Sequence, residues 1–153
     1  MKKIHINNDN NWCTPLDFYK KLDDEFHFDF DPCPYSEEPI LLCKDGLLID
    51  WSGKTIFINP PYSRKLKEAF VLRAIKESKQ GKVCVMLLPV STSTSLFKDH
   101  IEREAKEIRF IKGRIKFGKL DAEGKFYIPL NKKGKKQSGT KDSMIVIFDN
   151  REK

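Results

Sequence analysis

Hydrophobic and polar positions alternate with two different periods along this chain, and their order predicts an α/β fold. Five short apolar runs, rich in β-branched and aromatic residues, have the composition of strands: 26–30, 55–58, 83–88, 107–111 and 143–148. Three segments carry apolar residues at helical spacing: 15–25, 66–78 and 96–105. We expect a mostly parallel sheet that ends in a C-terminal antiparallel hairpin, formed by the last strand and the strand before it.

The start of the first predicted helix carries a structural signal and a candidate binding site. Thr14 is a good N-cap residue, and Pro15 suits the first helical position. The same helix start could hold a carboxylate, because the first backbone N–H groups of a helix lack partners within it.

Trp51 lies in an irregular stretch, 35–54, and is expected to pack in the core.

The tetrapeptide Asn59-Pro60-Pro61-Tyr62 directly follows the predicted strand 55–58. Two consecutive prolines donate no ladder hydrogen bonds, so the strand must end there in a rigid turn. Pro60 keeps only its carbonyl as an acceptor, and the side-chain oxygen of Asn59 is a second acceptor. Two close acceptors suit a flat amino group with two N–H bonds to donate, and Tyr62 offers a face on which a base can stack. We therefore expect Asn59, Pro60, Pro61 and Tyr62 to be catalytic; the structural alternative is a plain proline-rich turn after a core strand.

Charge is divided unevenly along the chain. Within a net charge of +7, residues 109–141 hold eleven Lys or Arg against two acids, whereas residues 9–50 hold eleven acids against three lysines. The basic stretch fits a polyanion and the acidic stretch a cationic or hydroxyl-rich group, although such stretches are often only solvated surface.

The four cysteines form no Cys-x-x-Cys pair, so we expect reduced thiols and no metal site. Without a membrane-length apolar run or a signal core, we expect one cytoplasmic domain over residues 1–153.

Several sequence blocks, taken in their order, resemble the compact phage-borne DNA N6-adenine methyltransferases. They are Trp-x-Thr-Pro at 12–15, Phe-Asp-x-Asp-Pro at 28–32, Asp-Gly-Leu at 45–47, Asn-Pro-Pro-Tyr-Ser at 59–63, Leu-Leu-Pro at 87–89, Gly-Arg-Ile-Lys-Phe at 113–117 and Ser-Met-Ile-Val at 143–146. The resemblance implies S-adenosylmethionine as cofactor, duplex DNA as partner and flipping of the target adenine out of the duplex. It also implies a phage or prophage origin within a bacterial host. No obligate protein partner is evident from the sequence. Because Asp31 and Asn59 are separated by only 28 positions, we expect an abbreviated Rossmann-like methyltransferase sheet.

The resemblance also assigns roles to individual residues. Asp31 would place a carboxylate at the end of strand 26–30, where it could attract the ammonium and sulfonium groups of the cofactor. The cofactor-binding candidates are Trp12, Thr14, Pro15, Asp31, Pro32, Asp45 and Asn59. A basic, lysine-rich insertion is expected at about residues 119–140. The DNA-binding candidates are Ser63, Arg64, Arg114, Lys116, Phe117, Lys132, Lys133, Lys135 and Lys136.

Two other functions use the same features. An RNA or protein-glutamine amino methyltransferase can carry the same tetrapeptide, and the basic stretch favours nucleic acid over protein without separating DNA from RNA. A catalytically silent DNA-binding protein of the same fold is the third alternative, which the intact tetrapeptide at 59–62 argues against.

Overall fold

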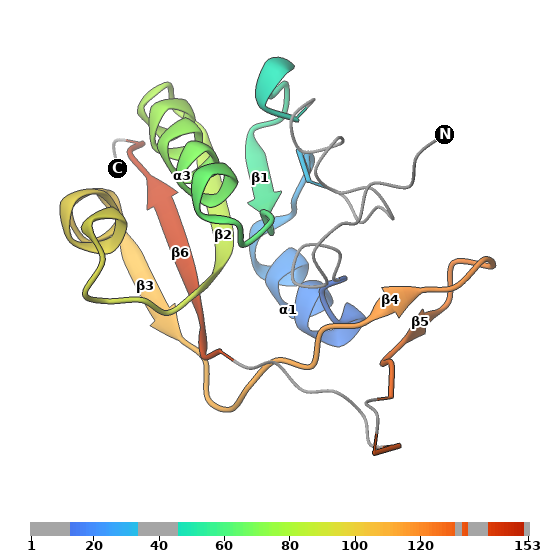
Figure 1. Ribbon diagram of the computed structural model, residues 1–153. Coiled ribbons are helices and arrows are strands. Elements are labelled where there is room, and N and C mark those ends of the chain that lie inside the picture. The colour runs from blue at the N-terminus through green and yellow to red at the C-terminus, as the bar shows by residue number, and fades with distance from the viewer. Residues whose placement is uncertain (1–12, 34–45, 131–132, 135–140, 152–153) are drawn as a thin grey trace.

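The computed structural model describes residues 13–33, 46–130, 133–134 and 141–151 (Figure 1). The predicted helices and most of the predicted strands are confirmed. The helical elements are α1 (Leu16–Phe26), α3 (Arg64–Lys79), the π-helical segment η2 (Leu96–Ile101) and α4 (Glu102–Glu104). The strands are β1 (Thr55–Ile58), β2 (Val83–Pro89), β3 (Glu107–Phe110), β4 (Lys119–Leu120), β5 (Phe126–Tyr127) and β6 (Ser143–Asp149). Among the described residues, no helix has the length and apolar character needed to cross a membrane.

The main sheet has four strands in the order β1-β2-β6-β3. β1 and β2 are parallel, whereas β6 is antiparallel to both β2 and β3. The expected antiparallel pairing of β6 with β3 is confirmed, but the expectation of a mostly parallel sheet is wrong. The reason is that β6 lies between β2 and β3, so one reversed strand makes two antiparallel pairs. In Figure 1 the arrows of β1 and β3 accordingly point one way and the arrow of β6 the other.

The predicted strand 26–30 is mostly not a strand. Phe26 is the last residue of α1, and His27 then takes a left-handed conformation with φ of 57°. Only Phe30 forms a bridge, parallel to Ile56 of β1. The Asp29 carboxylate accepts hydrogen bonds from the backbone N–H groups of Lys54 and Thr55, which ties this short edge segment to the start of β1. The carboxyl ends of the edge segment and of β1 therefore lie at the same end of the sheet.

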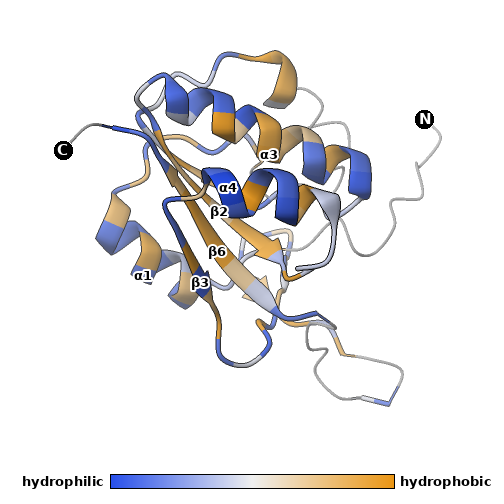
Figure 2. Cartoon of the chain, turned by 90° about the vertical axis from the view of Figure 1, so that its left-hand side faces the viewer, coloured by the Kyte–Doolittle hydropathy of each residue, from blue (hydrophilic) through white to orange (hydrophobic). Residues whose placement is uncertain are grey.

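Helices cover both faces of the sheet, as Figure 2 shows for α1 on one side and α3 with α4 on the other. The first apolar layer joins alternate sheet residues to α3 and η2: Ile56, Ile58, Phe70, Val71, Ala74, Met86, Leu88, Phe97, Met144 and Phe148. The second joins the opposite sheet face to α1: Leu22, Phe57, Val85, Leu87, Ile145 and Ile147. Full burial of such a side chain contributes about 1.5–3 kcal/mol, so these layers hold the strand ends in fixed positions.

Trp51 belongs to the core, as expected. It is 1% exposed, its ring stacks on Phe70, and its Nε1–H donates to the carbonyl of Gly46 at 2.8 Å. Arg73 of α3 also lies over the Trp51 ring, with its guanidinium 4.9 Å from the ring centre. The chain before β1 is thus anchored to α3 by an aromatic pair and a cation–π contact.

The expected lysine-rich insertion contains a small antiparallel hairpin, β4–β5, that is not part of the main sheet (Figure 1). Its turn is organised by Asp121, whose Oδ1 accepts hydrogen bonds from the backbone N–H groups of Glu123 and Lys125. Gly124 has φ of 79°, a conformation that glycine adopts without steric cost. The hairpin therefore has its own local stabilisation, whereas residues 131–132 and 135–140 lie outside the described part of the chain.

Candidate active site

The turn Asn59-Pro60-Pro61-Tyr62 leaves the carboxyl end of β1, as predicted. Both prolines are buried and all peptide bonds described here are trans, so the turn is a fixed part of the sheet edge. Asp31 ends the neighbouring edge segment, which runs parallel to β1. Asn59 and Asp31 are therefore brought to one end of the sheet, where open α/β sheets bind their ligands.

Thr14 is joined to this turn rather than to the helix that follows it. The Nδ2 group of Asn59 donates a hydrogen bond of 2.9 Å to the Thr14 hydroxyl oxygen, and Thr14 is 8% exposed. The prediction that Thr14 caps α1 is wrong: Pro15 occupies the cap position with ψ of 136°, and no side chain caps the helix start. Because its amide nitrogen is engaged by Thr14, Asn59 has its side-chain oxygen left as an acceptor, and no described residue donates to that oxygen.

Asp31 is a carboxylate in a poorly solvated position. Its Oδ1 accepts a 2.7 Å hydrogen bond from the backbone N–H of Cys33. Burial raises the pKa of Asp31 to about 6, and the Cys33 hydrogen bond opposes this rise only in part. The charge of Asp31 also reaches Cys13, where burial first and Asp31 second raise the thiol pKa. A partly buried carboxylate with spare lone pairs, close to residue 13, is suited to a cationic ligand.

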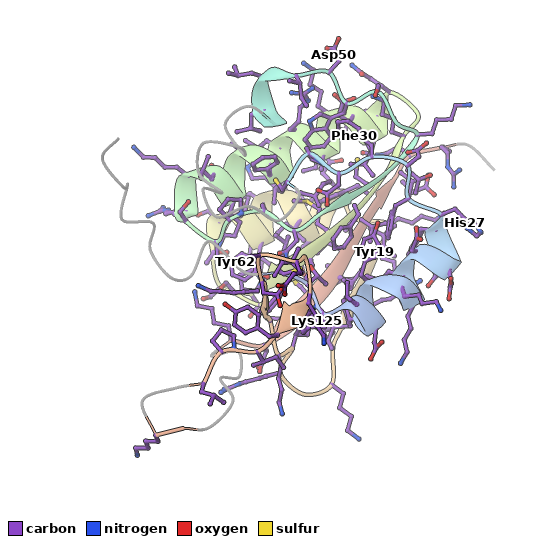
Figure 3. All side chains as sticks on the ribbon, turned by 90° about the vertical axis from the view of Figure 1, so that its right-hand side faces the viewer. Tyr19, His27, Phe30, Asp50, Tyr62 and Lys125 are labelled. Carbon is purple, nitrogen blue, oxygen red and sulfur yellow. The ribbon has the colours of Figure 1, made fainter. Side chains whose placement is uncertain are left out.

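Tyr62 presents an aromatic ring whose hydroxyl makes no hydrogen bond to the described part of the chain. Its Oη is buried without a partner among the described residues, and burial strongly raises the pKa of the phenol. The Tyr62 ring meets Phe117 edge to face, with centroids 6.3 Å apart and an interplanar angle of 89°. Figure 3 shows Tyr62 at the end of the sheet near the hairpin that bears Lys125, and Tyr19 projecting from α1 toward the sheet.

Gly118, which follows Phe117, pairs with Cys13, the residue before Thr14. Cys13 N–H donates to the Gly118 carbonyl at 2.7 Å, and Gly118 N–H donates to the Cys13 carbonyl at 3.1 Å. Residues 13 and 118 are far apart in the sequence and neither forms part of a periodic pattern. No local pattern indicates this contact, which brings the segment 117–118 to Thr14 and Tyr62.

The structure brings some of the predicted site residues together and leaves others on the surface. Thr14, Asp31, Asn59 and Tyr62 gather at one end of the sheet, with buried Pro32 and partly buried Pro15 beside them in sequence. Ser63 occupies the N-cap position of α3, without a side-chain cap hydrogen bond. The exposed basic candidates are Arg64, Arg114, Lys116 and Lys133, and Arg114 forms a 3.6 Å ion pair with Asp142. The remaining candidates lie outside the described residues: Trp12, Asp45, Lys132, Lys135 and Lys136.

Arg109, which was counted in the basic stretch, is engaged within the protein. Its two terminal nitrogens donate to the Glu25 carboxylate of α1 at 2.7 and 2.6 Å, and its Nε contacts Glu107. These hydrogen bonds raise the pKa of Arg109 and lower that of Glu25. The guanidinium also lies 5.6 Å from the Phe26 ring centre. This cation therefore holds α1 against β3, and the charge available to a polyanion begins further along the chain.

Comparison with known proteins places these features in a family. The family model described as DNA N-6-adenine-methyltransferase (Dam) matches residues 2–153, and the chain belongs to this family. A DNA N-6-adenine-methyltransferase of Haemophilus phage HP1 (strain HP1c1) is similar to it, with 39% identity over 115 residues. That match covers 69% of this chain and 65% of the phage protein, so the similarity spans somewhat less than two thirds of the relative.

Proposed function

We propose that this protein transfers a methyl group from S-adenosylmethionine to the exocyclic amino group of adenine in duplex DNA. Membership of the DNA N-6-adenine-methyltransferase (Dam) family supports the substrate class. The observation that carries the proposal is the 2.9 Å hydrogen bond from Asn59 Nδ2 to Thr14, because it leaves the Asn59 side-chain oxygen as an acceptor, one residue before the carbonyl of Pro60.

The two acceptors act on the amino group that is methylated. The lone pair of an aromatic amine is delocalised into its ring, which makes the nitrogen a poor nucleophile. Asn59 and Pro60 would accept hydrogen bonds from its two N–H groups and favour the tetrahedral nitrogen. That nitrogen would bond to the methyl carbon while the bond from this carbon to sulfur breaks, and one amino proton would then pass to water. These hydrogen bonds are stronger in the transition state than in the ground state, and they therefore lower the barrier.

The residues around Asp31 fit a cofactor that carries positive charge. S-adenosylmethionine would supply an electrophilic methyl group. Asp31 would attract its ammonium and sulfonium groups, and the buried Asp31 carboxylate gains most from such a partner because it is poorly solvated. Further proposed contacts, from the family resemblance, are Trp12, Thr14, Pro15, Pro32, Asp45 and Asn59.

The target adenine must leave the duplex to reach this turn, because its amino group is otherwise held within the base stack. Tyr62 would provide the stacking face for the extruded base. Phosphate contacts would supply most of the DNA affinity. We assign them to basic and polar residues after the turn and in the region 113–136: Ser63, Arg64, Arg114, Lys116, Lys132, Lys133, Lys135 and Lys136.

We further propose that residues 1–153 form one methyltransferase domain with an abbreviated Rossmann-like sheet, in which region 119–140 is a DNA-contacting insertion. The similarity to a protein of Haemophilus phage HP1 supports a phage or prophage origin, and hence action within the cytoplasm of a bacterial host.

Methyl transfer from labelled S-adenosylmethionine tests the proposal directly. Equal amounts of unmethylated duplex DNA, duplex RNA and a bacterial protein extract would be offered separately, and the labelled product would be digested to nucleosides or amino acids. We expect label in N6-methyladenine from DNA. Label confined to RNA or to glutamine would replace this function with one of the alternatives, and the absence of transfer to every substrate would refute it.

A further inference from the structure

The segment Phe117-Gly118 touches both halves of the proposed active site. The rings of Phe117 and Tyr62 are packed edge to face, with their centroids 6.3 Å apart. The next residue, Gly118, exchanges two backbone hydrogen bonds with Cys13. Cys13 directly precedes Thr14, whose hydroxyl accepts the hydrogen bond from Asn59. Two adjacent residues thus contact the proposed stacking residue, Tyr62, and the residue that precedes Thr14.

The orientation of the Tyr62 ring depends on packing. Its hydroxyl is buried, yet it has no hydrogen-bond partner among the described residues. A phenol that is fixed by a hydrogen bond would keep its ring angle after the loss of one neighbour, but residues 13–33, 46–130, 133–134 and 141–151 supply no such bond to Tyr62. The edge-to-face contact with Phe117 is the one aromatic contact of Tyr62 within the described part of the chain. Phe117 is therefore the residue best placed to fix the Tyr62 ring.

Gly118, the residue after Phe117, is held from the hairpin side. A Cβ added to Gly118 would lie 2.4 Å from the Tyr127 carbonyl oxygen and 2.5 Å from the Phe126 ring, distances too short for any side chain. The absence of a side chain lets β5 pass directly over Gly118 while its backbone remains paired with Cys13. The β4–β5 hairpin, the segment 117–118 and residue 13 are therefore packed as one unit.

We propose that Phe117 is a positioning residue: it sets the Tyr62 ring for base stacking, and Gly118 holds it there by joining the hairpin to Cys13. Phe117 then acts through Tyr62 rather than by touching DNA. This inference rests on the proposed adenine methyltransferase function, and it adds a link between the hairpin and the capture of the target base.

A double-mutant cycle of Phe117→Leu and Tyr62→Ala tests whether Phe117 acts through Tyr62. Methyl transfer to unmethylated plasmid DNA would be measured as kcat and KM for the wild type, both single variants and the double variant. Leucine keeps the apolar volume of Phe117 and removes its aromatic edge. We expect Phe117→Leu to lower kcat/KM by about 2- to 10-fold, the range of one aromatic pair, and to add nothing in the Tyr62→Ala background. DNA affinity in a filter-binding assay should remain at the wild-type value.

Phe110→Leu is the matched control, because Phe110 lies in β3 and is 61% exposed, away from the segment 117–118. It should leave kcat/KM unchanged. Gly118→Ala should reproduce the loss seen for Phe117→Leu, since the added Cβ must displace the hairpin or the Cys13 pairing. The midpoint of thermal unfolding would be measured for every variant, so that a loss of fold is separated from a loss of positioning.

Additive effects of Phe117→Leu and Tyr62→Ala would overturn the inference, because they would show that Phe117 does not act through Tyr62. A fall in DNA affinity in Phe117→Leu would also overturn it and would make Phe117 a direct DNA contact. Neither result would affect the proposed function, which fails only if the wild type transfers no methyl group to DNA; in that case the positioning role fails with it.

Discussion

Replacement of Asp31 by asparagine should stabilise the free protein at neutral pH and weaken its cofactor binding. Burial raises the pKa of Asp31 from 3.8 to about 6. The folded protein favours the neutral form of Asp31. The stability that this neutral form contributes is therefore fully present below pH 3.8, and it is lost as the pH rises through about 6 and the side chain must become charged. A shift of this size corresponds to about 3 kcal/mol, which is an upper limit because part of Asp31 reaches solvent. Asparagine removes the buried charge while its amide oxygen can still accept the Cys33 hydrogen bond.

Urea denaturation of wild type and Asp31→Asn at pH 4 and pH 7.5 measures the effect. The two proteins should have similar unfolding free energies at pH 4, and the variant should be more stable at pH 7.5 by about 1–3 kcal/mol. Isothermal calorimetry at pH 7.5 should show weaker binding of S-adenosylmethionine to the variant, since the attracting carboxylate is gone. We infer that the protein tolerates a destabilising charge here because the ligand needs it.

Asp29→Asn is a matched control two residues away. Backbone N–H groups of Lys54 and Thr55 lower the pKa of Asp29, with Lys54 the larger cause, so its stabilising contribution is present above pH 3.8 and is lost as the pH falls below that value. This variant should lose stability at pH 7.5, opposite in sign to Asp31→Asn. Equal stability of wild type and Asp31→Asn at both pH values would refute the reasoning about a buried charge. Unchanged cofactor affinity would remove Asp31 from the binding site.

Three further predictions concern the turn, the basic surface and Tyr62. Thr14→Val removes the acceptor that orients Asn59 and should lower kcat by about 10-fold, whereas Thr14→Ser should retain activity; equal rates for both variants would contradict this role. Lys116→Gln should reduce the slope of log DNA affinity against log salt by about 1, whereas Arg109→Gln, whose cation is paired with α1, should leave it unchanged. Tyr62→Phe should raise the unfolding free energy by about 1 kcal/mol and keep methyl transfer, because the buried hydroxyl has no partner among the described residues; a loss of activity at unchanged stability would instead make that hydroxyl a substrate contact.

Local sequence patterns predicted the parts of this fold that depend on local chemistry. The prolines at 60 and 61 had to end β1, the helical spacing in 66–78 matched α3, and the apolar environment predicted for Trp51 is observed. The resemblance to adenine methyltransferases added the roles of the residues and led to the family that the comparison shows. These conclusions needed no knowledge of which strand lies beside which.

The parts that were missed depend on contacts between distant segments. Nothing in the run Ser143–Asp149 indicates that it lies between β2 and β3, and this placement makes the sheet mostly antiparallel by pair. Thr14 has the side chain of an N-cap, but its hydroxyl accepts a hydrogen bond from Asn59, 45 positions away, a contact that only the fold creates. Alternating Phe26-His27-Phe28 resembles a strand, yet the left-handed His27 ends α1 there. In the first two cases a tertiary contact decided against the local preference, whereas at His27 a local cap on α1, with hydrogen bonds from residues 27 and 28 to Asp23, prevailed over the strand pattern.

The central claim is that Asn59 stabilises the transition state of amino methylation, and the single-turnover rate of Asn59→Ala tests it most directly. Wild type, Asn59→Ala and Asn59→Asp would each be saturated with unmethylated duplex DNA and labelled S-adenosylmethionine, after DNA binding had been verified by filter assay. We predict a fall of about 100-fold or more for Asn59→Ala at unchanged DNA affinity, and measurable activity for Asn59→Asp, whose carboxylate keeps an acceptor next to Thr14. A wild-type rate of N6-methyladenine formation by Asn59→Ala would show that the tetrapeptide is only a turn and would contradict the account.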